Sequence, residues 1–171
     1  ADALVQSFYC AYSLPAVTIR PFNTYGPRQS GRSVIPTIII QGLTQPEIRL
    51  GNLKTTRDFT YVSDTVAGFL AAAQADGIEG ETFNLGSGKE ITIGELARTI
   101  RMLMWSNMPI VEDAERLRPE KSEVLRLLAD NHKAREVLGW APRVSLAQGL
   151  DWTIAWIKEH PERYQAEKYQ I

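Results

Sequence analysis

The sequence predicts an α/β chain that contains a parallel sheet, and two observations indicate this class. Strand-like and helix-like segments alternate through its first part, whereas the last third is mostly helical. Residues 16–19, an apolar run, and residues 82–85 are both interpreted as strands buried on both faces, which normally belong to a parallel sheet covered by helices. Because two such strands are too few for a complete sheet, we expect their neighbours to come from a segment that precedes Ala1.

The elements of the first half follow from local patterns. Residues 1–12 carry apolar side chains at helical spacing, and residues 16–21 predict the first strand. Residues 34–43 predict a helix with Pro36 in its first turn, where a missing N–H costs little. Residues 48–50 predict a short strand, and residues 56–62 a second strand in which apolar and polar residues alternate. Residues 66–75 predict an alanine-rich helix, which Ser63 is expected to cap.

In the second half we expect a strand at 82–85, a helix at 93–105 and a short extended segment at 109–111. An irregular segment at 116–128 is followed by two helices, at 131–138 and 146–160. Thr92 followed by Glu95 predicts a capping box at the helix 93–105. Gly139 is expected to stop the next helix, and Ser145 to cap the last one. All four tryptophans are expected to be mostly core residues, with Trp152 and Trp156 forming a buried seam one turn apart.

Composition and charge exclude several classes of function. The chain has 171 residues, of which 44% are hydrophobic, enough for one ordinary core. Its net charge of −1 provides no electrostatic footprint for nucleic acid or an acidic membrane surface. No run approaches the roughly 20 apolar residues that span a bilayer, and no Cys/His cluster predicts a metal site. The single cysteine, Cys10, is expected to be a buried thiol in a protein of the reducing cytoplasm.

Four segments resemble, in the same order, the motifs of the extended short-chain dehydrogenases that modify nucleotide sugars. They are R-P-F-N-T-Y-G-P at 20–27, R-D-F-T-Y-V-S-D at 57–64, F-N-L-G-S-G at 83–88 and L-G-W-A-P at 138–142. Each motif alone is short, but four in order form a specific pattern. The chain therefore resembles NAD-dependent nucleotide-sugar epimerases and dehydratases, and within them the bacterial nucleotide-sugar 4,6-dehydratases.

The resemblance implies the C-terminal part of a Rossmann-type doubly wound parallel sheet plus a small, mostly helical substrate-binding domain. Residues 1–22 and 63–88 would be the last Rossmann elements, and residues 23–62 and 89–171 the nucleotide-sugar-binding lobe. In this family the dinucleotide-binding glycines and the catalytic Tyr and Lys lie upstream of the first motif. We therefore expect them before Ala1, assign no catalytic residue within this chain, and expect the chain alone to be inactive. The full-length enzyme is expected to bind NAD and a nucleotide-diphosphate sugar, and to form a homodimer through its opening helix.

Residue by residue, the resemblance places Pro21 and Phe22 near the nicotinamide and Asn23 beside the sugar diphosphate. Packing at the strand end is an equal alternative for Phe22. Asn23 has both an acceptor and donors for a ligand, and its alternative role is to cap the turn at 25–27.

Two further groups of residues would contact the substrate. Ser33 and Val34 would border the nucleotide base with Leu50 opposite them, although packing is the alternative for Val34 and Leu50. Arg57 and Arg118 would close on the diphosphate, because a guanidinium grips two oxygens at once. The alternative for Arg57 is a surface ion pair with Asp58 or Asp64.

Three functions follow from these motifs. The leading hypothesis is a 4,6-dehydratase that oxidises the sugar transiently at C4, with this chain supplying the nucleotide-sugar pocket. A 4-epimerase shares all four motifs and is the alternative enzyme. A non-catalytic nucleotide-sugar-binding fragment is the alternative from another class. The segment upstream of Ala1 discriminates between an enzyme and a fragment, since only the enzyme requires a glycine-rich motif and Tyr-x-x-x-Lys there.

Overall fold

The computed structural model of the protein describes residues 1–117 and 119–164, in which the chain forms two compact units. Unit 1 contains Ala1–Thr24, Asp58–Lys89 and Leu128–Val144. Unit 2 contains Tyr25–Arg57, Glu90–Leu127 and the described residues from Ser145 onward. Residues 128–144 thus group with unit 1, whereas the division expected from the sequence placed them in the lobe that binds the nucleotide sugar.

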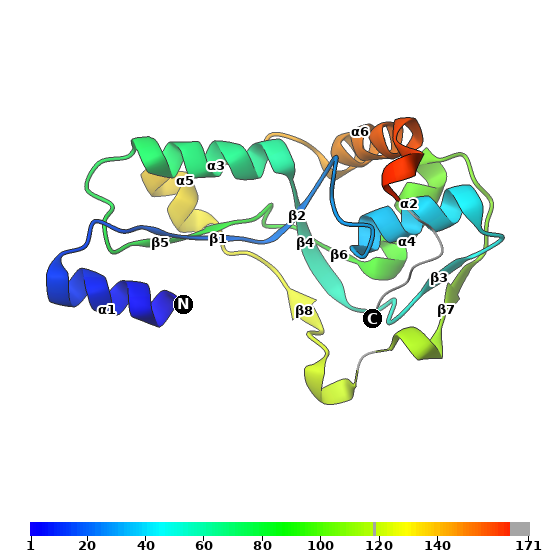
Figure 1. Ribbon diagram of the computed structural model, residues 1–171, viewed down its shortest axis with the longest axis horizontal. Helices are drawn as coiled ribbons and strands as arrows, with labels where there is room; N and C mark the ends of the chain where they lie inside the picture. Colours follow the sequence, from blue (N-terminus) through cyan, green and yellow to red (C-terminus); the bar gives the residue numbers. More distant parts are fainter. Residues whose placement is uncertain (118, 165–171) are drawn as a thin grey trace. The chain divides into compact units, whose positions relative to one another are not determined.

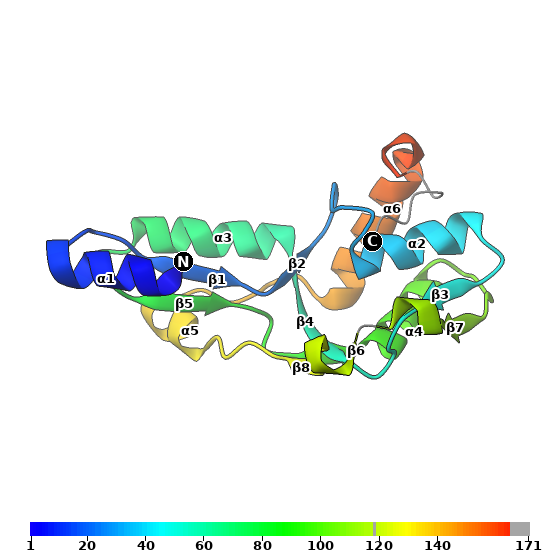
Figure 2. The ribbon, with the colours of Figure 1, turned by 60° about the horizontal axis from the view of Figure 1, so that its bottom comes forward.

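A pair of parallel strands forms the centre of unit 1. Strand β1 (Thr18–Pro21) pairs with β5 (Thr82–Leu85) from Thr18 opposite Thr82 to Pro21 opposite Leu85, which confirms the predicted parallel arrangement. Helix α3 (Val62–Gln74) runs along one face of this pair (Figure 2). Helix α5 (His132–Leu138) contacts both β5 and α3 (Figure 1).

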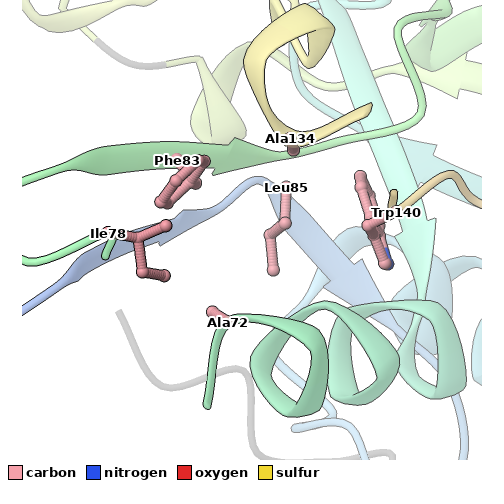
Figure 3. Close-up of a cluster of buried hydrophobic side chains, with 6 residues drawn as sticks. All are labelled: Ala72, Ile78, Phe83, Leu85, Ala134 and Trp140. Atoms are coloured by element: carbon pink, nitrogen blue, oxygen red, sulfur yellow. The ribbon is translucent and has the colours of Figure 1, made fainter. Parts of the chain in front are cut away.

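The core of unit 1 lies between these elements (Figure 3). Its buried side chains are Ala72, Ile78, Phe83, Leu85, Ala134 and Trp140. Leu85 points from β5 toward α3. Gly68 of α3 makes this possible, because a Cβ atom at that position would lie 2.4 Å from Leu85 Cδ1.

The N-terminal part of unit 1 is more exposed than the sequence predicts. Strand β1 was expected to be buried on both faces, but Ile19 is half-buried and Arg20 exposed, because β5 is the one strand that pairs with it in the described chain. Helix α1 (Asp2–Tyr12) buries none of its residues. Cys10 lies on this helix and is exposed, so the prediction of a buried thiol was wrong.

Three helices form the core of unit 2. Helices α2 (Val34–Thr44), α4 (Ile93–Leu103) and α6 (Leu146–Glu159) contact one another. Their buried apolar side chains include Ile35, Ile38, Ile39, Leu96, Ile100, Leu150, Ile154 and Ile157. The parallel strands β3 (Ile48–Leu50) and β7 (Ile110–Glu112) pair with each other, and β3 also contacts α2.

Local sequence signals identify most helix ends correctly. The Thr92 hydroxyl accepts from Glu95 N–H and the Glu95 carboxylate accepts from Thr92 N–H, which is the predicted capping box. Gly139 ends α5 with a left-handed φ of 61°. The Ser145 hydroxyl caps α6 by accepting from Gln148 N–H at 3.3 Å.

The prediction that Ser63 is an N-cap was wrong. Helix α3 begins at Val62, and Tyr61 occupies the N-cap position without a side-chain hydrogen bond. The reason is that strand β4 (Thr56–Tyr61) runs directly into the helix, so no polar loop residue separates them.

Short strands escaped prediction. Neither strand β2 (Asn23–Tyr25) nor strand β6 (Glu90–Thr92) was expected from the sequence. Strands β2, β4 and β6 follow one another in a sheet, and β8 (Arg126–Leu127) runs parallel to the first two residues of β4. Strands of two or three residues are too short to display a periodicity. Three short 3₁₀ helices complete the secondary structure: η1 (Ala114–Arg116), η2 (Glu120–Ser122) and η3 (Pro161–Arg163).

The tryptophans divide into two groups. Trp140 is buried, as predicted, at 4% exposure. Trp105 is 95% exposed and Trp152 is 43% exposed, so neither is a core residue and the predicted buried seam on the last helix does not form. No helix within the described residues is sufficiently long and apolar to cross a membrane.

Candidate functional site

The carboxyl ends of β1 and β5 lie side by side in unit 1. Pro21 pairs with Leu85, and the Phe22 N–H donates to the Leu85 carbonyl at 2.9 Å. Open α/β sheets bind ligands beyond this edge, where the strands run into their loops. Pro21 is exposed and Phe22 is half-buried there, so both present apolar surface beside the loop Gly86–Gly88 that follows β5.

Asn23 is the first residue of strand β2. Its side-chain Nδ2 donates to the Asp58 carbonyl at 3.0 Å. The hydrogen bond thus fixes the amide against β4 and not against the turn at 25–27. Within the described chain Asn23 Oδ1 accepts no hydrogen bond, so only the donor end of the amide is anchored by the protein.

Asp58 is the residue that sequence reasoning missed. Its side chain is fully buried, at 0% exposure, and its carboxylate accepts four hydrogen bonds. Three come from the loop after β5: Ser87 N–H at 2.8 Å, Ser87 Oγ at 2.5 Å and Gly88 N–H at 2.9 Å. The fourth comes from Ala129 N–H at 3.2 Å. Asp58 therefore holds the glycine-rich loop in place, and it does not form the surface ion pair with Arg57 that was considered as an alternative.

Close packing around this carboxylate explains why glycine occurs at position 86. A Cβ atom there would lie 2.2 Å from Ala129 Cβ and 2.9 Å from Asp58 Oδ2. The Asn131 side chain also donates to the Gly86 carbonyl at 2.7 Å, and Asn84 donates to the Asp130 carbonyl at 3.2 Å. The loop after β5 is thus fixed from both sides.

Asp64, the last residue of the second motif, has a similar structural role. It is buried at 5% exposure, and its carboxylate accepts the N–H groups of Arg143 and Val144 at 3.1 and 3.0 Å. Its backbone carbonyl accepts from Trp140 Nε1 at 2.8 Å. Two motifs that are separated in sequence, residues 57–64 and 138–142, therefore meet at this aspartate, and the indole visible in Figure 3 is held by it.

Unit 2 contains the other predicted ligand contacts. Ser33 is the N-cap residue of α2, but its side chain makes no capping hydrogen bond, and Val34, the first residue of the helix, is half-buried. Leu50 on β3 is only 4% exposed. Its burial agrees with the packing alternative given for this residue, whereas Ser33 and Val34 keep accessible surface.

Arg57 is the most constrained cation among the predicted site residues. Its side chain is 15% exposed, and its Nη1 donates to the carbonyls of Thr56 at 2.8 Å and Val124 at 2.7 Å. Its Nη2 lies 3.4 Å from Glu123 Oε1, a long contact for a charged pair. Its Nε makes no hydrogen bond to the described residues. One side of the guanidinium is thus anchored, while the Nε–Nη2 edge keeps most of its donors.

The last two predictions about the site concern Arg118 and metal binding. Arg118, the second expected diphosphate ligand, lies outside the described residues. Among the residues that the structure describes, no group of three or more His, Cys, Asp or Glu side chains is arranged to hold a metal ion.

Comparison with known proteins places this geometry in a family. The profile of the family described as GDP-mannose 4,6 dehydratase matches residues 1–153. A UDP-N-acetyl-alpha-D-glucosaminuronate decarboxylase from Bacillus cytotoxicus is 37% identical over 157 residues, covering 88% of this chain and 49% of the relative. A UDP-glucose 4-epimerase from Mycolicibacterium smegmatis is 33% identical over 151 residues, covering 86% of this chain and 47% of the relative.

The fold agrees with that assignment. The crystal structure of dTDP-glucose 4,6-dehydratase from Bacillus anthracis in complex with NAD superimposes with a TM-score of 0.84 at 25% identity, covering 95% of this chain and 51% of that protein. The predicted α/β fold with Rossmann-type parallel pairing is thereby confirmed. The chain spans about half the length of the proteins that it matches.

Proposed function

Since the chain belongs to the GDP-mannose 4,6 dehydratase family of extended short-chain dehydrogenases, we propose that it is the nucleotide-sugar-binding portion of an NAD-dependent 4,6-dehydratase. The observation that carries the nucleotide-sugar-binding part of the proposal is Arg57, whose guanidinium is anchored on one side and whose Nε–Nη2 edge would face a ligand. That planar edge matches two oxygens of a diphosphate. Arg118 is proposed as the second cation.

Residues of unit 1 would contact the reacting end of the substrate and the cofactor. Pro21 and Phe22 leave apolar surface at the carboxyl edge of β1, which fits a flat nicotinamide ring. Asn23, held through its Nδ2, would present Oδ1 to a sugar hydroxyl. When bound, NAD supplies the hydride acceptor and donor for transient oxidation at C4.

Residues of unit 2 would contact the nucleotide. Ser33 offers a hydroxyl that is not used for capping, and Val34 offers a half-buried apolar side chain for the face of a base. Leu50 would contribute as packing behind them, because it is almost fully buried. The catalytic acid and base are proposed to belong to the part of the enzyme that corresponds to the other half of its relatives.

A 4-epimerase is the second candidate, favoured by the 33% identity to a UDP-glucose 4-epimerase. The decarboxylase at 37% identity adds a third reaction that the family relatives perform. All three candidates require the same diphosphate contact, so Arg57 supports them equally.

Mass spectrometry of the reaction products distinguishes them. The full-length protein is incubated with UDP-N-acetylglucosamine, dTDP-glucose, GDP-mannose and UDP-glucuronic acid. Dehydration removes one water from the sugar nucleotide, decarboxylation removes carbon dioxide from the uronic acid, and epimerisation leaves the mass unchanged but alters the chromatographic position. We expect loss of water from one of the first three substrates. A protein that binds NAD and converts none of the four would contradict the proposal.

Helix α1 is proposed to lie at a homodimer interface in the full-length enzyme. Its apolar side chains Leu4, Phe8 and Tyr12 are 63%, 44% and 74% exposed. Apolar surface of this kind on a helix marks an interface or an aggregation hazard. We expect the full-length protein to be a dimer by size-exclusion chromatography with light scattering, and the isolated 171 residues to aggregate and to bind no NAD. A stable monomer of the isolated chain that binds NAD would contradict both expectations.

A further inference from the structure

We propose that Tyr164 is a positioning residue that fixes the loop 27–33, here called the base loop, for binding of the nucleotide, an inference that rests on the function proposed above. The base loop leads directly into Ser33 and Val34, the proposed contacts to the nucleotide base. Tyr164 follows η3 near the end of the described chain, and both segments belong to unit 2.

Two parts of the Tyr164 side chain contact the base loop. Its hydroxyl donates to the Gln29 carbonyl at 3.1 Å, a hydrogen bond between residues 135 positions apart in sequence. Its ring lies over Gly31, where a Cβ atom would be 3.3 Å from Tyr164 Cδ1. A larger residue at position 31 would thus press against the ring. Partial burial raises the pKa of the Tyr164 phenol, although Arg163 opposes this, so the hydroxyl remains a donor at neutral pH.

Tyr164 is itself held by the end of α6. The Trp156 ring meets the Tyr164 ring edge-on at 6.0 Å and stacks on the His160 ring at 4.4 Å. The Arg163 guanidinium lies 5.9 Å from the centre of the Trp156 ring. These contacts join the tyrosine to a helix whose other side is buried in the core of unit 2. The restraint on the base loop is therefore transmitted from a rigid element.

The base loop includes a residue in a strained backbone conformation. Arg28 has a left-handed φ of 66°, a conformation that non-glycine residues rarely adopt. Within the loop, Ser33 N–H donates to the Ser30 carbonyl at 2.9 Å, and the Thr37 hydroxyl donates to the Gly31 carbonyl at 3.0 Å. Both bonds are local, whereas the bond from Tyr164 ties the loop to a distant helix. A loop fixed before binding spares the ligand the entropic cost of ordering it.

Deleting the Tyr164 hydroxyl tests this role in the full-length protein. For Tyr164→Phe we expect Kd for UDP, dTDP or GDP, whichever binds, and KM for the matching sugar nucleotide to rise about 3- to 10-fold with kcat within about twofold, because one hydrogen bond is lost away from the reacting atoms. Gly31→Ala should change Kd in the same direction. Tyr9→Phe is the matched control, because the Tyr9 ring packs on Gly80 in unit 1.

Hydrogen exchange gives a second, ligand-independent measurement. Amides of residues 29–33 should exchange faster in Tyr164→Phe than in the wild type and in Tyr9→Phe. Unchanged exchange, or an unchanged Kd in Tyr164→Phe while Arg57→Ala binds more weakly, would overturn the positioning role and leave the proposed function intact. A wild-type protein that binds none of the three nucleotides would overturn the proposed function and this inference with it.

Discussion

Arg57 and Asp58 are neighbours on strand β4, yet their environments differ in every respect. Arg57 belongs to unit 2 and Asp58 to unit 1. Asp58 is fully buried, and neutral N–H and O–H groups occupy its carboxylate with four hydrogen bonds. Arg57 keeps 15% of its side chain exposed, and the Nε–Nη2 edge of its guanidinium has only a contact of 3.4 Å to Glu123.

The difference gives a criterion that separates the residues of a motif that stabilise the fold from those that could bind a ligand. A buried charged group that is satisfied by protein donors stabilises the fold, and its removal leaves several donors unpaired. A charged group with unused donors at an accessible edge is available for a ligand. By this criterion Asp58 fixes the loop after β5, while Arg57 is the proposed diphosphate ligand. The predictions below test that division, beginning with the largest effect.

Asp58→Ala tests whether Asp58 stabilises the fold. It removes the acceptor of four hydrogen bonds and leaves the buried N–H of Ala129 and the part-buried N–H of Ser87 unpaired. We expect the free energy of unfolding of the full-length protein to fall by about 3–5 kcal/mol, measured by urea denaturation. The control Asp151→Ala changes an exposed aspartate on α6 and should stay within about 0.5 kcal/mol of the wild type. An equal small change in both variants would show that Asp58 is not an anchor.

Arg57→Ala tests whether Arg57 binds the diphosphate. We expect binding of the nucleoside diphosphate to weaken by about 2–4 kcal/mol in calorimetric titration, the range for removing one partner of a buried charge pair. Arg57→Lys should recover part of the affinity, because an ammonium cannot reproduce the planar fork. Arg98→Ala, which alters an exposed arginine of α4, is the control. Undiminished affinity in Arg57→Ala would make Arg57 a structural residue like its neighbour.

Two serines near helix N-termini should differ in their contributions to stability, because the Ser145 hydroxyl forms a capping hydrogen bond and Ser63 is not an N-cap. Ser145→Ala should lower the free energy of unfolding by about 1 kcal/mol, since its hydroxyl caps α6. Ser63→Ala should cause a much smaller change, because Ser63 lies inside α3 and not at its N-cap. Thermal unfolding of both variants is the measurement, and similar losses in the two would contradict the observed helix start.

The smallest expected effect is a pH dependence of the free energy of unfolding. It comes from Glu90, which bonds to both strands of the pair β4 and β8. Hydrogen bonds from Arg126 and Thr56 lower the pKa of the Glu90 carboxyl below its ordinary value. A lowered pKa in the folded state means that the stabilisation is present above the unfolded-state pKa and is lost as the pH falls through the folded-state value. The stability difference between wild type and Glu90→Gln should therefore shrink from pH 7 toward acid pH. A difference that is constant with pH would exclude this linkage.

Most elements of this fold could be predicted because their signals are local. The capping box at Thr92 and the left-handed Gly139 depend on residues within one turn of each other. The parallel pairing of β1 and β5 was predicted from two short strand-like segments, each followed by a loop that carries glycine. Strand β2 could not be predicted, because its polar three-residue sequence gains strand geometry only from its neighbours in the sheet.

The candidate site was predictable in part for the same reason. Motif resemblance singled out Asn23 and Arg57, but it did not identify the partners that orient them, Asp58 and Val124. The role of Asp58 depends on donors 29 to 71 residues away in sequence. No spacing rule covers such distances. A useful sign was nevertheless present, since a glycine-rich loop after a buried strand leaves N–H groups that require an acceptor.

A crystal structure of the full-length protein with NAD and a bound nucleoside diphosphate tests the central claim most directly. We expect Nε and Nη2 of Arg57 to contact diphosphate oxygens, while the four hydrogen bonds of the Asp58 carboxylate stay as they are without ligand. A diphosphate bound away from Arg57, with the Arg57–Glu123 contact unchanged, would contradict it.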